Sequence, residues 1–136
     1  MKRRNLTAAV CLALAGALTL TACGGGATTG SGSGGVGPIG ADHPRADTDF
    51  WNSYIKYFPD KAKELGVNLL NPTNSQNKVE TLVANAQSLQ SQGAKAIIMA
   101  PQDTGAIAST LDRLDKAKIP VVTVDTRPDK GKTFMV

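Results

Sequence analysis

From Val36 to the last residue, short apolar runs alternate with longer segments in which apolar residues recur every three or four positions. Short apolar runs predict strands, and a spacing of three and four predicts helices with one buried face. The predicted strands are 36–42, 67–70, 96–100 and 119–125, and the predicted helices are 51–65, 79–89 and 107–117. Strands that alternate with helices through short connections predict right-handed crossovers, and hence an α/β fold with a doubly wound parallel sheet and helices on both faces.

Local signals refine the ends of these segments. Asp47 or Thr48 offers an N-cap for the first helix, and Pro59 predicts a kink or a new start inside it, because proline has no N–H to donate. Asn77, followed by Glu80 three residues later, predicts a capping box at the start of the second helix.

Ligands of doubly wound sheets bind beyond the carboxyl ends of the strands. This rule selects four loops, 42–51, 71–77, 101–104 and 125–128. Further along, Gly131-Lys132-Thr133 does not complete a phosphate-binding loop, because Thr126 stands where the motif needs its first glycine. We therefore expect no nucleotide hydrolysis, and residues 133–136 predict the beginning of a further strand.

The first 35 residues have a different character. Three basic residues precede an uncharged apolar run at 6–20, and this run leads into Leu20-Thr21-Ala22-Cys23. These features predict a signal peptide over residues 1–22 rather than a membrane span, which needs about 20 apolar residues. Leu-Thr-Ala-Cys resembles the bacterial lipobox, which implies cleavage before Cys23 and a lipid on its sulfur. The alternative is an ordinary signal peptide that leaves Cys23 as a free thiol.

Residues 23–35 are rich in Gly, Ser and Thr, which predicts a flexible tether between the lipid and the folded domain at 36–136. The formal net charge of the chain is +4, and removal of the three basic residues of the signal leaves +1. The remaining Lys and Arg are scattered among the acidic residues, so nucleic-acid binding is not expected.

The sequence suggests no catalytic or metal site. His43 is the single histidine, with no second His or Cys near it at metal-ligand spacing, and we expect it to be exposed in a loop. Cys11 lies in the apolar run of the signal and would be removed with it. No Ser-His-Asp or Cys-His set is evident, so we expect a protein that is not an enzyme and that needs no cofactor.

Five of the six aromatic residues lie within positions 50–58. Phe50 and Trp51 are adjacent, so a helix cannot direct both into one core, and they follow the first predicted strand. Aromatic rings placed there are suited to stack on the C–H face of a sugar, whose hydroxyls bond to carboxylates and Arg. Asp125 ends an apolar strand at the same edge, with turn initiation as its alternative role. Asp103 is either a ligand contact or a helix cap.

Three stretches carry a family resemblance: "DFWNSYIKYFPDKAKELGVNLL", "NSQNKVETLVANAQSLQSQGAKAIIMAPQDTGAI" and "KIPVVTVDTRPDKGKTFMV". Together with the lipobox, they resemble the N-terminal lobe of sugar-binding lipoproteins of bacterial ABC importers, of the ribose-binding-like periplasmic type. The resemblance implies that two α/β lobes close on a monosaccharide, that the closed form docks on the ABC permease subunits, and that no reaction is catalysed.

The resemblance also implies roles for residues. The stacking aromatic pair of the family falls on Phe50 and Trp51, and its sugar-binding Asp falls on Asp125. Arg127 stands one place later than the family's Arg. In the loop after the third strand, Ala100 replaces an Asn that often binds the sugar, which leaves Gln102 and Asp103 to line the mouth of the site.

The same resemblance implies a place and a partner. The lipid would hold the protein on the outer face of the cytoplasmic membrane, on the extracytoplasmic side. The family has a second lobe that this sequence lacks, so residues 36–136 are expected to be the N-terminal lobe of a truncated or divided protein. An alternative function for the same fold is a ligand-sensing domain that signals to a membrane receptor kinase.

Overall fold

The computed structural model describes residues 37–136. The predicted signal peptide (1–22), the predicted lipidation site Cys23 and the predicted tether (23–35) lie outside the described residues. Within the described part, none of the helices combines the length and the apolar character that crossing a membrane requires.

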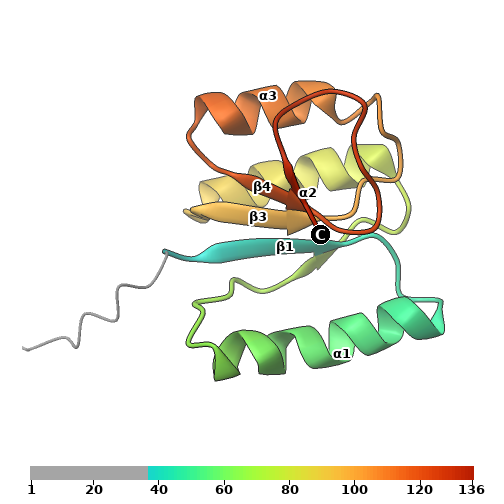
Figure 1. The fold of residues 1–136 in the computed structure, drawn as a ribbon, viewed down its shortest axis with the longest axis vertical. Coiled ribbons are helices and arrows are strands. Elements are labelled where there is room, and N and C mark those ends of the chain that lie inside the picture. Colours follow the sequence, from blue (N-terminus) through green and yellow to red (C-terminus); the bar gives the residue numbers. More distant parts are fainter. Residues whose placement is uncertain (1–36) are drawn as a thin grey trace, which may run out of the picture. The chain divides into compact units, whose positions relative to one another are not determined.

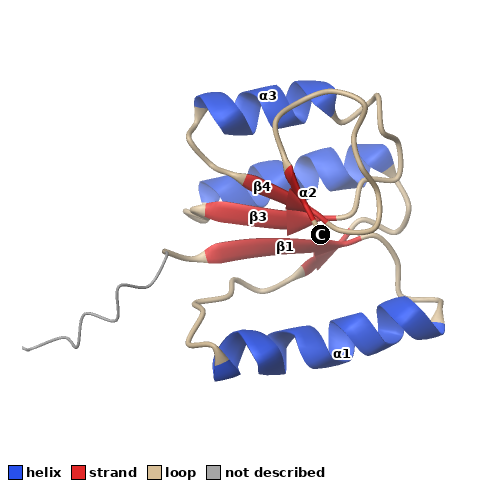
Figure 2. Ribbon diagram, viewed as in Figure 1, coloured by secondary structure: helices blue, strands red, loops and turns tan. Residues whose placement is uncertain are grey.

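Five parallel strands form one sheet, as the alternating pattern predicts (Figures 1 and 2). The strands are β1 (Ile39–His43), β2 (Thr73–Asn74), β3 (Ala96–Met99), β4 (Val121–Thr123) and β5 (Phe134–Met135). Their order across the sheet is β2-β1-β3-β4-β5, so the chain winds outward from β1 in one direction and then in the other. The doubly wound α/β class is confirmed, and its switch point lies between β1 and β3.

The three helices cover both faces of the sheet. Figure 1 shows α1 (Asp49–Glu64) on one face, with α2 (Val79–Ser91) and α3 (Ala108–Lys116) together on the other. Because both faces are covered, residues 40–43 of β1 are all buried.

The first helix starts as predicted but does not restart at Pro59. The Thr48 side chain accepts a hydrogen bond from the Trp51 amide at 3.4 Å and caps the helix. The helix then continues through Pro59, because Trp51 before the proline and Ala62 after it are both buried and keep the two halves on the sheet. The predicted new start at Pro59 is therefore wrong.

The second strand lies later in the chain than predicted. Segment 67–70 contributes only an isolated bridge between Leu69 and Ile39, and the paired residues are Thr73 and Asn74. Pro72 interrupts the ladder because it has no donor. The Thr73 hydroxyl then donates to the Asp42 carboxylate at 2.7 Å and fixes the register of the strand.

The predicted capping box at Asn77 is also wrong. The Asn77 amide donates to the Pro44 carbonyl at 2.6 Å, and Asn77 has a positive φ of 58°. The loop after β1 thus holds Asn77 outside the helix, and Lys78 becomes the N-cap without a side-chain hydrogen bond.

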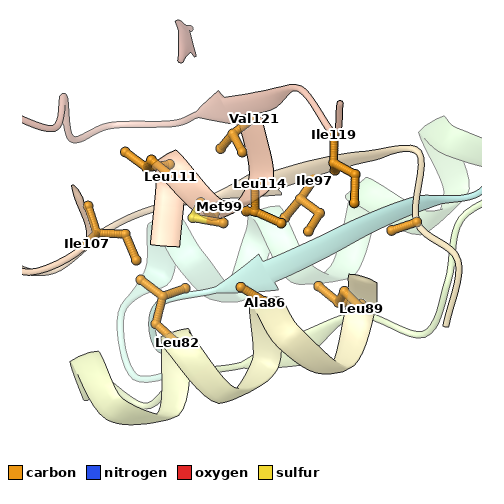
Figure 3. Close-up of a cluster of buried hydrophobic side chains, with 11 residues drawn as sticks. Leu82, Ala86, Leu89, Ile97, Met99, Ile107, Leu111, Leu114, Ile119 and Val121 are labelled. Atoms are coloured by element: carbon orange, nitrogen blue, oxygen red, sulfur yellow. The ribbon is translucent and has the colours of Figure 1, made fainter. Parts of the chain in front are cut away.

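The main hydrophobic core lies between the sheet and the α2–α3 layer (Figure 3). Gly40 of β1 makes this packing possible, because a Cβ on Gly40 would lie 3.0 to 3.1 Å from three Leu89 atoms. The absence of a side chain therefore lets α2 approach β1 closely. The labelled core residues are Leu82, Ala86, Leu89, Ile97, Met99, Ile107, Leu111, Leu114, Ile119 and Val121.

Candidate functional site

The candidate site is the carboxyl edge of the sheet around the switch point. Strands β1, β3 and β4 end side by side there, because their ladders pair Asp42 with Met99 and Met99 with Thr123 (Figure 1). The loops that follow β3 and β4 are joined by a hydrogen bond from the Asp129 amide to the Thr104 carbonyl, at 3.1 Å. Three of the loops selected by the sequence therefore begin at the same edge.

Phe50 and Trp51 point in different directions from the first turn of α1. The Phe50 side chain is 59% exposed, whereas Trp51 is 7% exposed. Trp51 lines a gap between α1 and the sheet that is too small to admit a water molecule. Their rings meet edge to face, with centroids 5.0 Å apart. Of the predicted stacking pair, Phe50 presents its ring to solvent and Trp51 packs behind it.

Asp125 follows β4 in a tight turn. The Thr126 amide donates to the Val124 carbonyl at 2.7 Å, and Asp125 between them has φ +68°. This is a three-residue γ-turn with its central residue in the left-handed region, which is unfavourable for a residue other than glycine. The side chain is exposed at the carboxyl edge. Backbone strain of this kind gathers at functional sites.

The other predicted site residues are exposed on the same loops. The side-chain amide of Gln102 donates from Nε2 to the Ala100 backbone carbonyl at 3.0 Å. Asp103 accepts hydrogen bonds from the backbone amides of Gly105 and Ala106 at 2.9 and 2.8 Å and so fixes the turn before α3. The N-cap of α3 is Ile107, without a side-chain hydrogen bond, so the predicted helix-capping role of Asp103 is wrong. Arg127 forms no salt bridge within residues 37–136.

Next to β1 and β2, an open hollow of about 430 Å³ lies at the same edge. Arg45 and Asp47 form an ion pair there, and the rest of the lining consists of Ala46, Asn74, Gln76 and Asn77. Amide and guanidinium groups of this kind suit hydroxyl-bearing ligands. Both loops follow predicted strands, but the hollow between them could not be predicted, because only the pairing of β1 with β2 brings them together.

Two buried polar residues at the end of β1 were missed. His43, expected in an exposed loop, is 4% exposed inside the strand, so that prediction is wrong. Asp42 is 3% exposed, and its Oδ1 accepts hydrogen bonds from Thr73 and Asn85, both at 2.7 Å. Alternation along β1 directs Asp42 toward α2 and His43 toward α1. That alternation was the available sequence signal, but the partners of Asp42 come from distant parts of the chain.

Burial shifts the pKa values of both side chains. Desolvation raises the pKa of Asp42, and hydrogen bonds from Thr73, Ser75 and Asn85 partly oppose this effect. Desolvation lowers the pKa of His43, opposed by the neighbouring Asp42 carboxylate. Asp42 Oδ2 and His43 Nε2 have no hydrogen-bond partner among the described residues. The uncharged imidazole is therefore the form that the fold favours.

The described residues contain no cluster of three or more His, Cys, Asp or Glu side chains suited to a metal ion. The edge instead offers an exposed aromatic ring, carboxylates, amides and a guanidinium. Such groups are suited to stack on a small polyhydroxylated ligand and to exchange hydrogen bonds with it.

Comparison with known proteins finds a matching family and several relatives. The family described as periplasmic binding protein domain matches residues 40–136. The ribose import binding protein of Salmonella typhimurium is 37% identical over 71 residues, which are 52% of this chain and 24% of that protein. The chain thus spans about a quarter of the length of this curated relative.

Solved structures of ligand-bound periplasmic binding proteins also resemble this chain. The Caulobacter myo-inositol binding protein, bound to myo-inositol, is 28% identical with a TM-score of 0.65, over 72% of this chain and 33% of that one. The periplasmic binding protein component of the arabinose ABC transporter from Shewanella sp. ANA-3, bound to arabinofuranose, is 27% identical with a TM-score of 0.65. That match covers 70% of this chain and 31% of the other.

Proposed function

The chain belongs to the periplasmic binding protein domain family, and from this premise we propose that residues 36–136 form one wall of a monosaccharide site in the solute-binding component of an ABC transporter. The observation that carries the proposal is the exposed Phe50 ring at the same sheet edge as the strained, exposed Asp125. Relatives named for ribose, myo-inositol and arabinofuranose support the class of ligand.

Phe50 and Asp125 have complementary roles in this proposal. The flat C–H face of a sugar stacks on the Phe50 ring, which removes apolar surface of both from water. The Asp125 carboxylate accepts hydrogen bonds from sugar hydroxyls, and bonds to a charged acceptor are stronger than neutral ones. Trp51 contributes by filling the space behind Phe50.

Three further residues complete the proposed wall. Arg127 donates to ring or hydroxyl oxygens, and Gln102 supplies an amide at the mouth of the site. Asp103 acts mainly by fixing its loop, because one carboxylate oxygen already accepts two backbone hydrogen bonds. No bond of the ligand is made or broken, so the protein binds and releases the sugar without a cofactor.

A second wall opposite this edge would exclude water and complete the hydrogen bonds of the sugar. We propose that a second lobe supplies it by closing over the ligand, and that the closed form is what the ABC permease recognises. A lipid on Cys23 would keep the protein at the extracytoplasmic membrane surface, next to that permease.

The proposal is tested by titrating the protein with D-ribose, L-arabinose, D-glucose and myo-inositol, with binding followed by calorimetry and by amide chemical shifts. The shift measurement also detects weak binding by one wall alone. We expect at least one sugar to shift amides of residues 44–51, 100–104 and 124–128.

Asp125→Ala is the decisive variant, and it should weaken that sugar by about 1.5–3 kcal/mol, the contribution typical of a hydrogen bond to a charged group. Asp60→Ala is the matched control, because it removes an exposed carboxylate from the middle of α1. Affinity unchanged by Asp125→Ala for every sugar that binds would refute the assignment of Asp125.

A further inference from the structure

An aromatic cluster surrounds the buried histidine beneath the first turns of α1. We define the aromatic cluster as His43, Phe50, Trp51, Tyr54 and Phe58. Tyr54 contacts all the other members: its ring centroid lies 5.6 Å from His43, 6.4 Å from Phe50, 5.4 Å from Trp51 and 5.2 Å from Phe58. Tyr54 is thus the one member that joins the buried imidazole to the exposed Phe50 ring.

Phe50 depends on Tyr54 and Trp51 for its orientation. The Phe50 ring is 59% exposed, so little else restricts its rotamers. It stacks on Tyr54 with an interplanar angle of 26° and meets Trp51 at 84°. Ordering a free side chain on binding costs free energy, and a ring already held in place avoids most of that cost.

His43 supports Tyr54 from the sheet side. Its ring meets Tyr54 and Phe58 nearly at right angles, at 77° and 86°. The titratable groups around it are the Asp42 carboxylate from β1 and the Tyr54 phenol from α1. Ile98 of β3, which lines the same gap beneath α1, does not titrate, and the Ser75 hydroxyl beyond β2 donates to the His43 backbone carbonyl.

We propose that Tyr54 is a positioning residue that holds Phe50 ready to stack on the sugar, and that this function requires an uncharged His43. The inference rests on the proposed function. An imidazolium at this position would carry a positive charge beneath α1 with no acceptor for its Nε2–H among the described residues. Its hydration would require α1 to move away from β1, which would release Tyr54 and with it Phe50.

The first test needs no ligand, because His43 is the single histidine and Trp51 the single tryptophan of the chain. Proton NMR of the imidazole gives the titration of His43, and fluorescence gives the environment of Trp51. We expect both signals to change together as the pH falls below about 6.5. The transition in Trp51 emission should disappear in His43→Gln and persist in Asp42→Asn, with far-UV circular dichroism confirming that each variant is folded.

The second test measures sugar affinity with the same four sugars. Tyr54→Leu should weaken binding about 2- to 10-fold, the range expected from one aromatic pair. Tyr54→Phe keeps the ring and should bind normally. Tyr57→Leu is the matched control, because Tyr57 lies on the same helix, is 59% exposed and makes no ring contact within the cluster. Wild-type affinity should fall with acidification, whereas the affinity of His43→Gln should change little.

The outcomes separate the two proposals. If the protein binds none of the four sugars, the proposed function is contradicted, whatever the fluorescence shows. Titration of His43 without a change in Trp51 emission, or a folded Tyr54→Leu that binds as tightly as wild type, would overturn the positioning inference alone.

Discussion

The single residue with the most informative geometry is Asp125. Its φ of +68° lies in a region that costs a residue with a Cβ roughly 1–2 kcal/mol, and glycine avoids this cost. We therefore expect Asp125→Gly to be more stable than Asp125→Ala by about 1 kcal/mol in urea unfolding, while both lose sugar affinity. Equal stability of the two variants would show that the turn is not strained at Asp125.

His43 and Asp42 make stability depend on pH in opposite directions. The pKa of His43 is lowered, so the unfolded chain binds a proton near pH 6.5 before the folded chain does, and stability is lost as the pH falls below about 6.5. The pKa of Asp42 is raised above its usual 3.8, so the folded chain holds that proton longer, and stability is lost as the pH rises from about 3.8 through the raised value.

Urea unfolding at pH 7, 6 and 5 separates the two contributions. We expect wild type to lose stability between pH 7 and 5, and His43→Gln to lose less over the same range. The Asp42→Asn variant should still lose the stability that depends on His43 between pH 7 and 5. If the free energy of unfolding changes with pH as much in His43→Gln as in wild type, this assignment is contradicted, because the chain contains no other histidine.

Among the elements, β1 and α2 pack closely at Gly40 and Leu89. A methyl group on Gly40 would lie 3.0 to 3.1 Å from Leu89 atoms, so Gly40→Ala should destabilise the fold by about 1–3 kcal/mol. Leu89→Ala should cost about 2–5 kcal/mol because Leu89 is fully buried. The double variant should cost less than the sum, since the smaller side chain at 89 makes room for the added methyl.

Gly105→Ala provides the control for this prediction. A Cβ there would meet its nearest atoms at 3.6 Å, which is ordinary contact, so its effect should stay within about 0.5 kcal/mol. Additive losses for Gly40→Ala and Leu89→Ala in urea unfolding would show that the two residues do not constrain each other.

The order and type of most elements could be predicted from the spacing of apolar residues. In β3, β4 and the three helices, most of the positions that packing buries are apolar in the sequence. The sequence-based predictions are wrong where contacts between residues far apart in the chain determine the local structure. Pro72 and the Thr73–Asp42 hydrogen bond move β2 away from the apolar run at 67–70. Similarly, the hydrogen bond from Asn77 to the Pro44 carbonyl overrides a local capping signal.

At the scale of the whole fold, the carboxyl edge was predictable because it depends on strand order alone. Exposure at that edge was not predictable. Phe50 and Trp51 have similar apolar character in sequence, and only the packing of α1 on the sheet exposes one and buries the other. The burial of Asp42 and His43 likewise depends on partners that the fold brings from α1, α2 and β2.

The proposed transport role also requires the protein to remain near its permease, and the lipid on Cys23 is the proposed means. Cys23→Ser should therefore move the protein from the membrane fraction to the soluble fraction and abolish labelling by a palmitate analogue. Cys11→Ser is the matched control, because that cysteine would be removed with the signal peptide. Membrane retention of Cys23→Ser, or its loss in Cys11→Ser, would contradict anchoring through Cys23.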